Sequence, residues 1–295
     1  MKSKLTPVFW LGLMSGFNHA VSSLGFVVLS PLLMHGARYA VLQHVSPQGR
    51  IQLLGVLFAL KPCCEALVAF LLSRFYRSRC LSSLSVCLCC VLFSLCLFAI
   101  SIFRGDLSLL FLAQIFLGCG SAAIYLIEAA VTEASTASTR AKAFNSLEWA
   151  IGMGMLLGPI LGSWGAHWGE GWHPDYPYVL FAMLGCLLFV IGARFVPIHA
   201  VLQPKMTQAP AGLSWWDYVA WFTFMLGWHG YFHWFPVLLI HHFSYTTMQL
   251  GHVFTYIGVL YVFCQFGVVR WFTRYSRHHR VLFVSLPVIA LCIAL

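Results

Sequence analysis

The feature that most constrains this chain is a succession of apolar segments, each about as long as a bilayer is thick. A helix that crosses a membrane needs about 20 consecutive apolar residues. Eight segments reach that length, near 8–33, 51–72, 81–102, 107–131, 143–167, 178–196, 215–240 and 248–269. A ninth begins near Val281, and we expect the chain to end inside it at Leu295. The sequence therefore predicts an all-α, multi-pass membrane protein with eight complete spans and a partial ninth.

The distribution of charge predicts how these spans are oriented. Only 8% of the residues are charged, whereas a soluble domain has about 25%. If the N-terminus is cytoplasmic, all but four of the 17 Lys and Arg residues fall on the inner side, the exceptions being Arg38, Arg50, Arg104 and Lys61. This asymmetry follows the positive-inside rule. We therefore expect a cytoplasmic N-terminus and contact with the lipid bilayer, and we expect no nucleic-acid partner.

The cysteines and the motif content exclude several other kinds of protein. Most of the 11 cysteines lie within spans and lack the paired spacing of a zinc site. Buried thiols behave as small apolar side chains. No nucleophile–base pair, phosphate loop or metal constellation occurs at a usable spacing. We therefore expect no metal, no cofactor and no enzymatic activity.

Two basic connectors indicate an internal repeat. Arg74 and Arg77 follow the second span, and Arg274 and Arg277 follow the eighth. Short basic loops also resemble each other through the charge rule alone, so chance similarity remains an alternative. A proline-rich segment separates the halves, and a pair of bundles is a transporter architecture. The predicted domains are an N-terminal six-helix bundle at 1–196, a cytoplasmic linker at 197–214 and an incomplete C-terminal bundle at 215–295.

The fifth predicted span carries a stripe of small residues. They lie four apart, at Ala150, Gly154, Gly158, Gly162 and Ala166. Residues at this spacing share one helix face, and small residues allow membrane helices to approach closely. Pro159 interrupts the backbone hydrogen bonds beside the stripe. The pattern predicts either a plain helix-packing face or a sliding seam between the two halves.

Three segments carry motifs beyond their apolar character. The connector AFLLSRFYRSR at 69–79 is similar to the pattern G-x-L-x-D-R-x-G-R-R, with Arg74 and Arg77 at matching positions. The segment FLAQIFLGCGSAA at 111–123 is similar to R-x-x-q-G-x-g-a-A, with Gln114 in place of the arginine. The fifth span matches a third motif through its glycines and Pro159. Together these segments resemble the major facilitator superfamily, and within it the twelve-span drug–proton antiporters that include tetracycline exporters.

The resemblance implies a fold, a mechanism and a location. It implies a two-bundle transporter that acts as a monomer in a bacterial inner membrane and moves a small molecule together with protons. It also implies residues that act in the conformational change, namely Arg74, Arg77, Glu133, Arg140, Gly154, Gly158, Pro159 and Gly162.

Ionisable groups inside a membrane are costly and are therefore candidates for function. Lys61 and Glu65 lie four apart on the second span and share one face. They are either a self-neutralising structural ion pair or a proton-binding carboxylate with a pKa tuned by the lysine. Asn18 and His19 lie in the first span. A histidine can carry a proton near neutral pH, and the alternative is a role in packing or hydrogen bonding.

Two further sets of residues are candidates for the substrate pathway. Gln114 and Tyr125 of the fourth span are expected to line it, whereas Glu128 and Glu148 are expected to reach the cytoplasmic interface. His229 and His233 of the seventh span lie four apart, a spacing that can bind a metal or haem. Their aromatic neighbours equally fit a membrane-interface belt or a stacking wall for an aromatic substrate.

These observations lead to three functional hypotheses. The first is a secondary active transporter that exports a small organic solute by proton-coupled alternating access. The second keeps the fold but imports a nutrient or a metal chelate. The third is a non-transporting or degenerate membrane protein.

Overall fold

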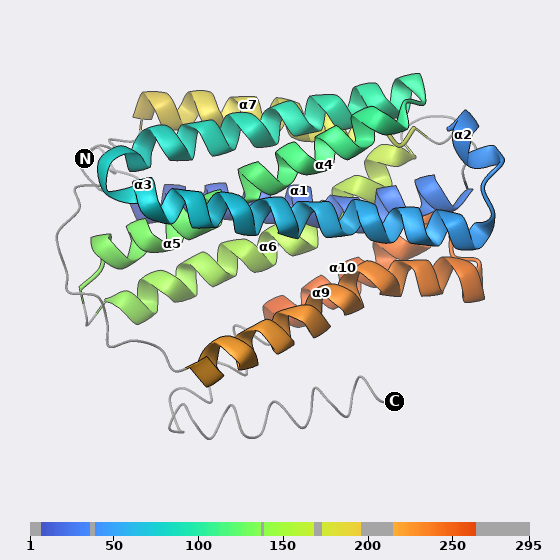
Figure 1. The fold of residues 1–295 in the computed structure, drawn as a ribbon. Helices are drawn as coiled ribbons and strands as arrows, with labels where there is room; N and C mark the ends of the chain where they lie inside the picture. Colours follow the sequence, from blue (N-terminus) through green and yellow to red (C-terminus); the bar gives the residue numbers. More distant parts are fainter. Residues whose placement is uncertain (1–6, 36–38, 137–138, 168–172, 196–214, 264–295) are drawn as a thin grey trace.

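The structure is a computed structural model that describes residues 7–35, 39–136, 139–167, 173–195 and 215–263. Helices make up nearly all of this part of the chain, and no strand occurs within it (Figure 1). The predicted all-α class is therefore confirmed. The predicted linker at 197–214 and the partial ninth span lie outside the described residues, and the division into two domains stays a prediction.

The helices follow the predicted spans closely. Their bounds are α1 Pro7–His35, α2 Ala40–Gln43, α3 Pro47–Arg104, α4 Leu107–Ser121, α5 Ala123–Ala134, α6 Arg140–Ala166, α7 Tyr176–Phe195, α9 Trp215–Phe243 and α10 Thr247–Phe263. Helix α3 folds back on itself, so it supplies two antiparallel limbs (Figure 1). Helices α4 and α5 are separated only by Ala122 and together occupy the fourth predicted span.

Length and composition identify five described segments that could cross a membrane. They are Phe9–Met34, Pro47–Leu72, Ser83–Arg104, Leu107–Glu133 and Lys142–Ala166. Two shorter apolar helices, Tyr176–Leu188 and Thr247–Phe263, coincide with the sixth and eighth predicted spans. Helix α9 covers the seventh. The multi-pass membrane architecture is thus supported, whereas the count of eight spans and the cytoplasmic N-terminus stay predictions.

The helices run back and forth between two ends of the molecule (Figure 1). One end carries α2, the α3–α4 turn and the α9–α10 connection, and the opposite end carries the start of α1. We call these the outer end and the inner end, following the orientation predicted from charge. At the outer end, Gly105 adopts a left-handed φ of 68°, which allows the tight turn from α3 into α4.

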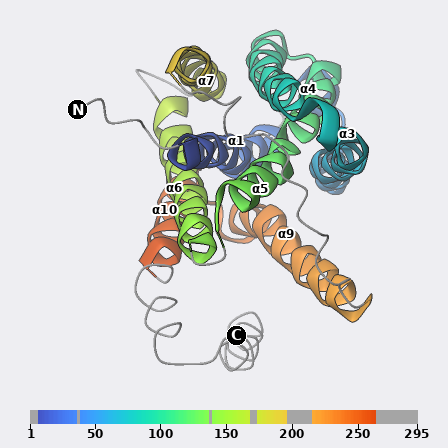
Figure 2. The same cartoon turned by 90° about the vertical axis from the view of Figure 1, so that its left-hand side faces the viewer.

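The small-residue stripe of α6 packs against α1, which lies near the centre of the molecule (Figure 2). Gly154 lies against Gly16 and Ala20, and Gly158 lies against Ala20 and Ser23. A Cβ at either glycine would collide with backbone atoms of α1, so only glycine permits this approach. The Ser23 hydroxyl also donates a hydrogen bond of 3.4 Å to the Gly154 carbonyl.

This contact corrects the expectation that the stripe is a sliding seam between the halves. Both α1 and α6 belong to the first predicted bundle, so the stripe is a packing face within it. A different face of α6 meets α10, where Gly152 lies against Tyr261, Gly258 against Leu156, and Gly251 against Ser163. Pattern alone could not separate these outcomes, because every face of a membrane helix is apolar.

The fold predicts different effects on stability for the same substitution at two glycines. Gly158→Ala should destabilise the protein by about 1–3 kcal/mol, because an overpacked side chain must push α6 away from α1. Gly227→Ala is the matched control, since a Cβ there meets no atom of the described structure. It should be neutral, or stabilising by up to about 1 kcal/mol through helix propensity. Thermal unfolding in detergent, followed by tryptophan fluorescence, compares the two, and equal Tm values would contradict this packing.

Candidate functional site

The polar centre of the molecule is an ion pair on the first limb of α3. Lys61 Nζ lies 3.2 Å from Glu65 Oε2, and the two side chains are only 16% and 18% exposed. Lys61 is 14 residues from the start of α3, which at 1.5 Å per residue places it about 21 Å from the outer end. The pair therefore lies near mid-membrane, where a separated charge would be costly.

Helix α4 approaches this pair closely because Gly118 has no side chain. A Cβ at Gly118 would collide with the Lys61 backbone and with Cys64. One turn earlier on α4, Gln114 is 3% exposed, and its Oε1 has no hydrogen-bond partner in the described part of the chain. The structure thus places Gln114 inside the bundle, close to the depth of Lys61.

Asn18 connects α1 to the break between α4 and α5. Its Nδ2 donates to the Ser121 carbonyl at 3.4 Å, and the Ser121 hydroxyl donates back to Asn18 Oδ1 at 3.5 Å. Ser121 is the last residue of α4, so the asparagine satisfies a carbonyl at the end of that helix. This geometry supports the hydrogen-bonding alternative for Asn18. Sequence reasoning missed Ser121, because a serine in an apolar run gives no sign of its partner.

His19 lies beside the ion pair from the α1 side. Its Nδ1 donates to the Ser15 carbonyl at 2.9 Å, and the charges of both Lys61 and Glu65 act on its ring. The ring is mostly buried. The structure therefore brings three of the predicted pathway residues together at the junction of α1 and α3, as their similar depths suggested.

A second group of polar residues lies between the ion pair and the inner end. Tyr125 of α5 is 48% exposed, and the charges of Glu65 and Glu128 both act on its hydroxyl. Glu128 of α5 and Glu148 of α6 lie within electrostatic reach of each other. Both carboxylates are partly buried and lie on the inner halves of α5 and α6.

Tyr261 of α10 joins this group from the second half of the chain. Its side chain hydrogen-bonds with the Glu148 carboxylate, which connects α6 to α10. Sequence reasoning missed Tyr261. The only available signal was a phenol in an apolar helix, and a buried phenol usually has a hydrogen-bond partner.

Besides the contact between α6 and α10, the two halves meet in the outer half of the molecule through an aromatic cluster. Phe26 of α1, Phe232 of α9 and Phe254 of α10 are buried, with ring centroids 5.7–6.1 Å apart. His233 stacks on Phe58 at 4.4 Å and meets the edge of Phe26 at 5.1 Å. The histidine therefore packs against aromatic rings of the first bundle, and the alternatives of an interface belt, a substrate-stacking wall or a metal site stay predictions. The side chain of His229 lies outside the described residues.

The contact between the halves weakens toward the inner end of α9. Near the outer end, the Trp234 ring lies against Gly55, and Ile240 is buried. Farther in, Gly227 and Gly230 face open space within the described structure. Figure 2, seen from the inner end, shows α9 diverging from α3 and α5. The described helices are thus closed at the outer end and splayed at the inner end along α9.

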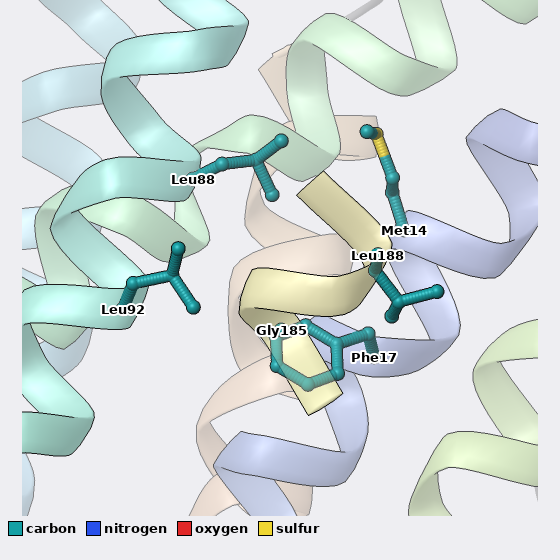
Figure 3. A pocket seen from close by; sticks show the side chains of 6 residues that line it. All are labelled: Met14, Phe17, Leu88, Leu92, Gly185 and Leu188. Carbon is teal, nitrogen blue, oxygen red and sulfur yellow. The ribbon is translucent and has the colours of Figure 1, made fainter. Parts of the chain in front are cut away.

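A separate pocket between α1, α3 and α7 holds no polar group (Figure 3). Its walls are Met14, Phe17, Leu88, Leu92, Gly185 and Leu188. Within the described residues, no group of three or more His, Cys, Asp or Glu side chains is placed to hold a metal ion.

The residues implied by the motif resemblance lie toward the inner end. Arg140 begins α6 and is exposed, and Glu133 lies in the last turn of α5. The side chains of Arg74 and Arg77 lie outside the described residues. A role for these four residues in conformational change stays a prediction.

Two variants of the ion pair separate the effect of an unpaired buried charge on stability from the effect of altered side-chain packing. Lys61→Met should lower stability by up to about 3 kcal/mol, because it leaves the Glu65 carboxylate buried without its cation. The double variant Lys61→Met/Glu65→Leu should recover most of this loss, since neither charge remains. Thermal unfolding of the single and double variants in one detergent measures the difference. The pair is energetically uncoupled if both variants unfold at the same temperature.

Comparison with known proteins agrees with this architecture. The family model described as Major Facilitator Superfamily matches residues 11–295, which is almost the whole chain. A search of the curated proteins finds no match. Helical composition, apolar spans and a match of this extent lead to one conclusion: the chain belongs to the Major Facilitator Superfamily, a family of membrane transporters and not of enzymes.

Proposed function

We propose that this transporter exports a small organic solute across a bacterial inner membrane and is driven by protons. The observation that carries the proposal is the buried Lys61–Glu65 pair, with His19 beside it and a polar path toward the inner end. A titratable pair held in the membrane interior at this energetic cost is a functional site by default.

Glu65 is the proton-binding group in this proposal. While ionised, it holds the Lys61 ammonium at 3.2 Å. Protonation removes its charge and releases the lysine, which changes the net charge at the centre of the transporter. Tyr125 and Glu128 lie on the path between Glu65 and the inner end. Proton and solute would each favour one arrangement of the halves, as coupled transport requires.

The aromatic contact at the outer end acts as the gate in this mechanism. Phe26, Phe232 and Phe254 close the outer end, whereas the inner part of α9 diverges from the first bundle. Rocking one half against the other would separate these rings and close the inner end. The Tyr261–Glu148 hydrogen bond joins α6 and α10 during this movement.

The direction of transport is proposed by analogy. Gly154, Gly158, Pro159 and Gly162 match the motif of the drug–proton antiporters that the sequence resembles, and this supports export. Gln114 stands where those antiporters usually have an arginine, which favours a second candidate, a proton-coupled importer of a nutrient or metal chelate. Uptake and extrusion of the same labelled solute in cells with and without the protein would separate the two.

A substitution at Glu65 tests proton coupling. In liposomes, a panel of labelled amphipathic solutes is screened for flux driven by an imposed pH gradient. Glu65→Gln should reduce gradient-driven flux of a transported solute by about 100-fold, because the amide cannot exchange a proton. Exchange of the solute without a gradient should persist. Asp175→Asn, which makes the same change at the outer start of α7, is the control and should keep the wild-type flux.

Two results would oppose this proposal. If the flux of Glu65→Gln follows the pH gradient as in the wild-type protein, Glu65 is not the proton site. If the wild-type protein moves none of the solutes under either gradient direction, while it binds one of them, coupled transport of this class is wrong.

A further inference from the structure

A small cavity inside the first bundle is closed on one side by α9 of the second half. Helices α1, α3, α4, α7 and α9 all contribute to its wall, and α9 contributes His233. As it stands, the cavity has room for about one water molecule. A movement of α9 away from the first bundle would take His233 with it and enlarge the cavity toward the space between the halves.

The ring of His233 occupies a place between two aromatic rings of the first bundle. It stacks on Phe58 of α3, with ring centroids 4.4 Å apart and planes inclined by 26°. It meets Phe26 of α1 edge-on, at 5.1 Å and 78°. Both phenylalanines are buried and line the cavity. Aromatic rings prefer stacked and edge-to-face contacts at about these distances, so the two phenylalanines form a slot for one flat ring.

Two polar atoms of the cavity wall are buried without a hydrogen-bond partner in the described part of the chain. They are Gln114 Oε1 and the Tyr178 hydroxyl, on side chains that are 3% and 1% exposed. Buried polar atoms almost always have a partner. The amide oxygen can only accept a hydrogen bond, whereas the hydroxyl can donate one. An occupant that satisfies both groups therefore offers one donor and one acceptor.

The charges beside the cavity cancel each other. Lys61 lines the wall, and its ammonium lies 3.2 Å from the Glu65 carboxylate. An ionised solute would bring a charge that no group of the opposite sign is left to balance, and an unbalanced buried charge is costly. The wall therefore favours an uncharged occupant while the ion pair is intact.

We propose that this cavity is a solute-binding site for an uncharged, flat heteroaromatic ring that carries an N–H donor and a carbonyl acceptor. The ring takes the place of His233 on Phe58 and Phe26. Its N–H donates to Gln114 Oε1, and its carbonyl accepts from the Tyr178 hydroxyl. This inference rests on the proposed function, because it names the class of small solute that the transporter carries.

In this assignment His233 closes the site until the solute arrives. It lies about one helical turn from Gly230, which faces open space toward the inner end within the described structure. A solute that enters from the inner end along α9 therefore meets the imidazole ring before it meets the cavity. The stacking contacts that the imidazole loses on displacement are regained by the ring of the solute, so one flat ring exchanges for another.

Removal of the His233 ring tests the site without a transport measurement. His233→Ala vacates the slot, and ligand-observed NMR of the purified protein in detergent measures the Kd of small probes. 2-Pyridone and 4-pyridone carry the donor and the acceptor on neighbouring and on opposite ring atoms. N-methyl-2-pyridone lacks the donor, 2-piperidone lacks the aromatic ring, and benzene lacks both polar groups. His241→Ala, at an exposed histidine of the same helix, is the matched control and also reports partition into the detergent.

The site predicts a specific pattern of affinities. At least one pyridone should bind to His233→Ala about tenfold or more tightly than to the wild type and to His241→Ala, since no ring has to be displaced. N-methylation of the probe, or loss of its aromatic ring, should weaken binding to His233→Ala about tenfold or more. Adding Gln114→Leu or Tyr178→Phe to that variant should have the same effect.

Several results would overturn the site. They are equal affinity of the pyridones for all three proteins, benzene that binds as tightly as the pyridones, and tighter binding of benzoate, which is a charged ring. Thermal unfolding in the same detergent shows whether His233→Ala folds. If it does not, Gln114→Leu and Tyr178→Phe in the wild-type background should each weaken pyridone binding about tenfold, and unchanged or undetectable binding there would equally overturn the site.

A structure of His233→Ala with bound pyridone provides an independent measurement. The ring is expected between Phe58 and Phe26, and a ring bound elsewhere would contradict the assignment. The failure of this inference is distinguishable from that of the proposed function. Binding with the expected pattern, but no flux of any solute under a pH gradient, would reject the function and keep the site. Gradient-driven flux confined to solutes without such a ring would reject the site and keep the function.

Discussion

A lipid bilayer offers no hydrogen-bond partner to a polar atom, and this constraint organises the described structure. Each polar side chain within the spans must find its partner inside the protein. Asn18 meets Ser121 at the end of α4, and Ser23 reaches the Gly154 carbonyl of α6. Lys61 and Glu65 neutralise each other. The polar interior is therefore a set of specific links between helices, and the links determine which helices stay together.

The contact of α1 with α6 keeps α1 at the centre of the bundle, where its polar side chains can reach several other helices. Because Gly154 and Gly158 have no side chains, α6 lies directly on the α1 backbone and α1 remains central. From that place α1 presents Asn18 to α4 and His19 to the ion pair on α3. The glycines of α6 thus have a positioning role, because the close contact that they allow holds α1 and its polar side chains in place.

The two ends of the molecule differ in a way that suits a transporter. Aromatic rings packed at tilted angles hold α1, α9 and α10 together in the outer half of the molecule, and such apolar contacts can separate without leaving a charge unpaired. Tyr125, Glu128 and Glu148 lie toward the inner end, where water can solvate them. In the proposed mechanism, an apolar gate at one end and titratable groups at the other would allow a change of charge at the centre to bias the arrangement of the halves.

The sequence by itself determined the helices, their apolar character and the faces that residues share within one helix, because both length and periodicity are local properties. Lys61 and Glu65 could be paired from their spacing, and the stripe on α6 could be recognised as a close-packing face. Only the tertiary structure decided that this stripe packs against α1 and that Asn18 hydrogen-bonds with Ser121. It also decided that Tyr178 and Gln114 line the same cavity. In lipid all helix faces are similarly apolar, so no periodic pattern distinguishes one neighbour from another, and side-chain shape and hydrogen bonding between distant segments make that choice.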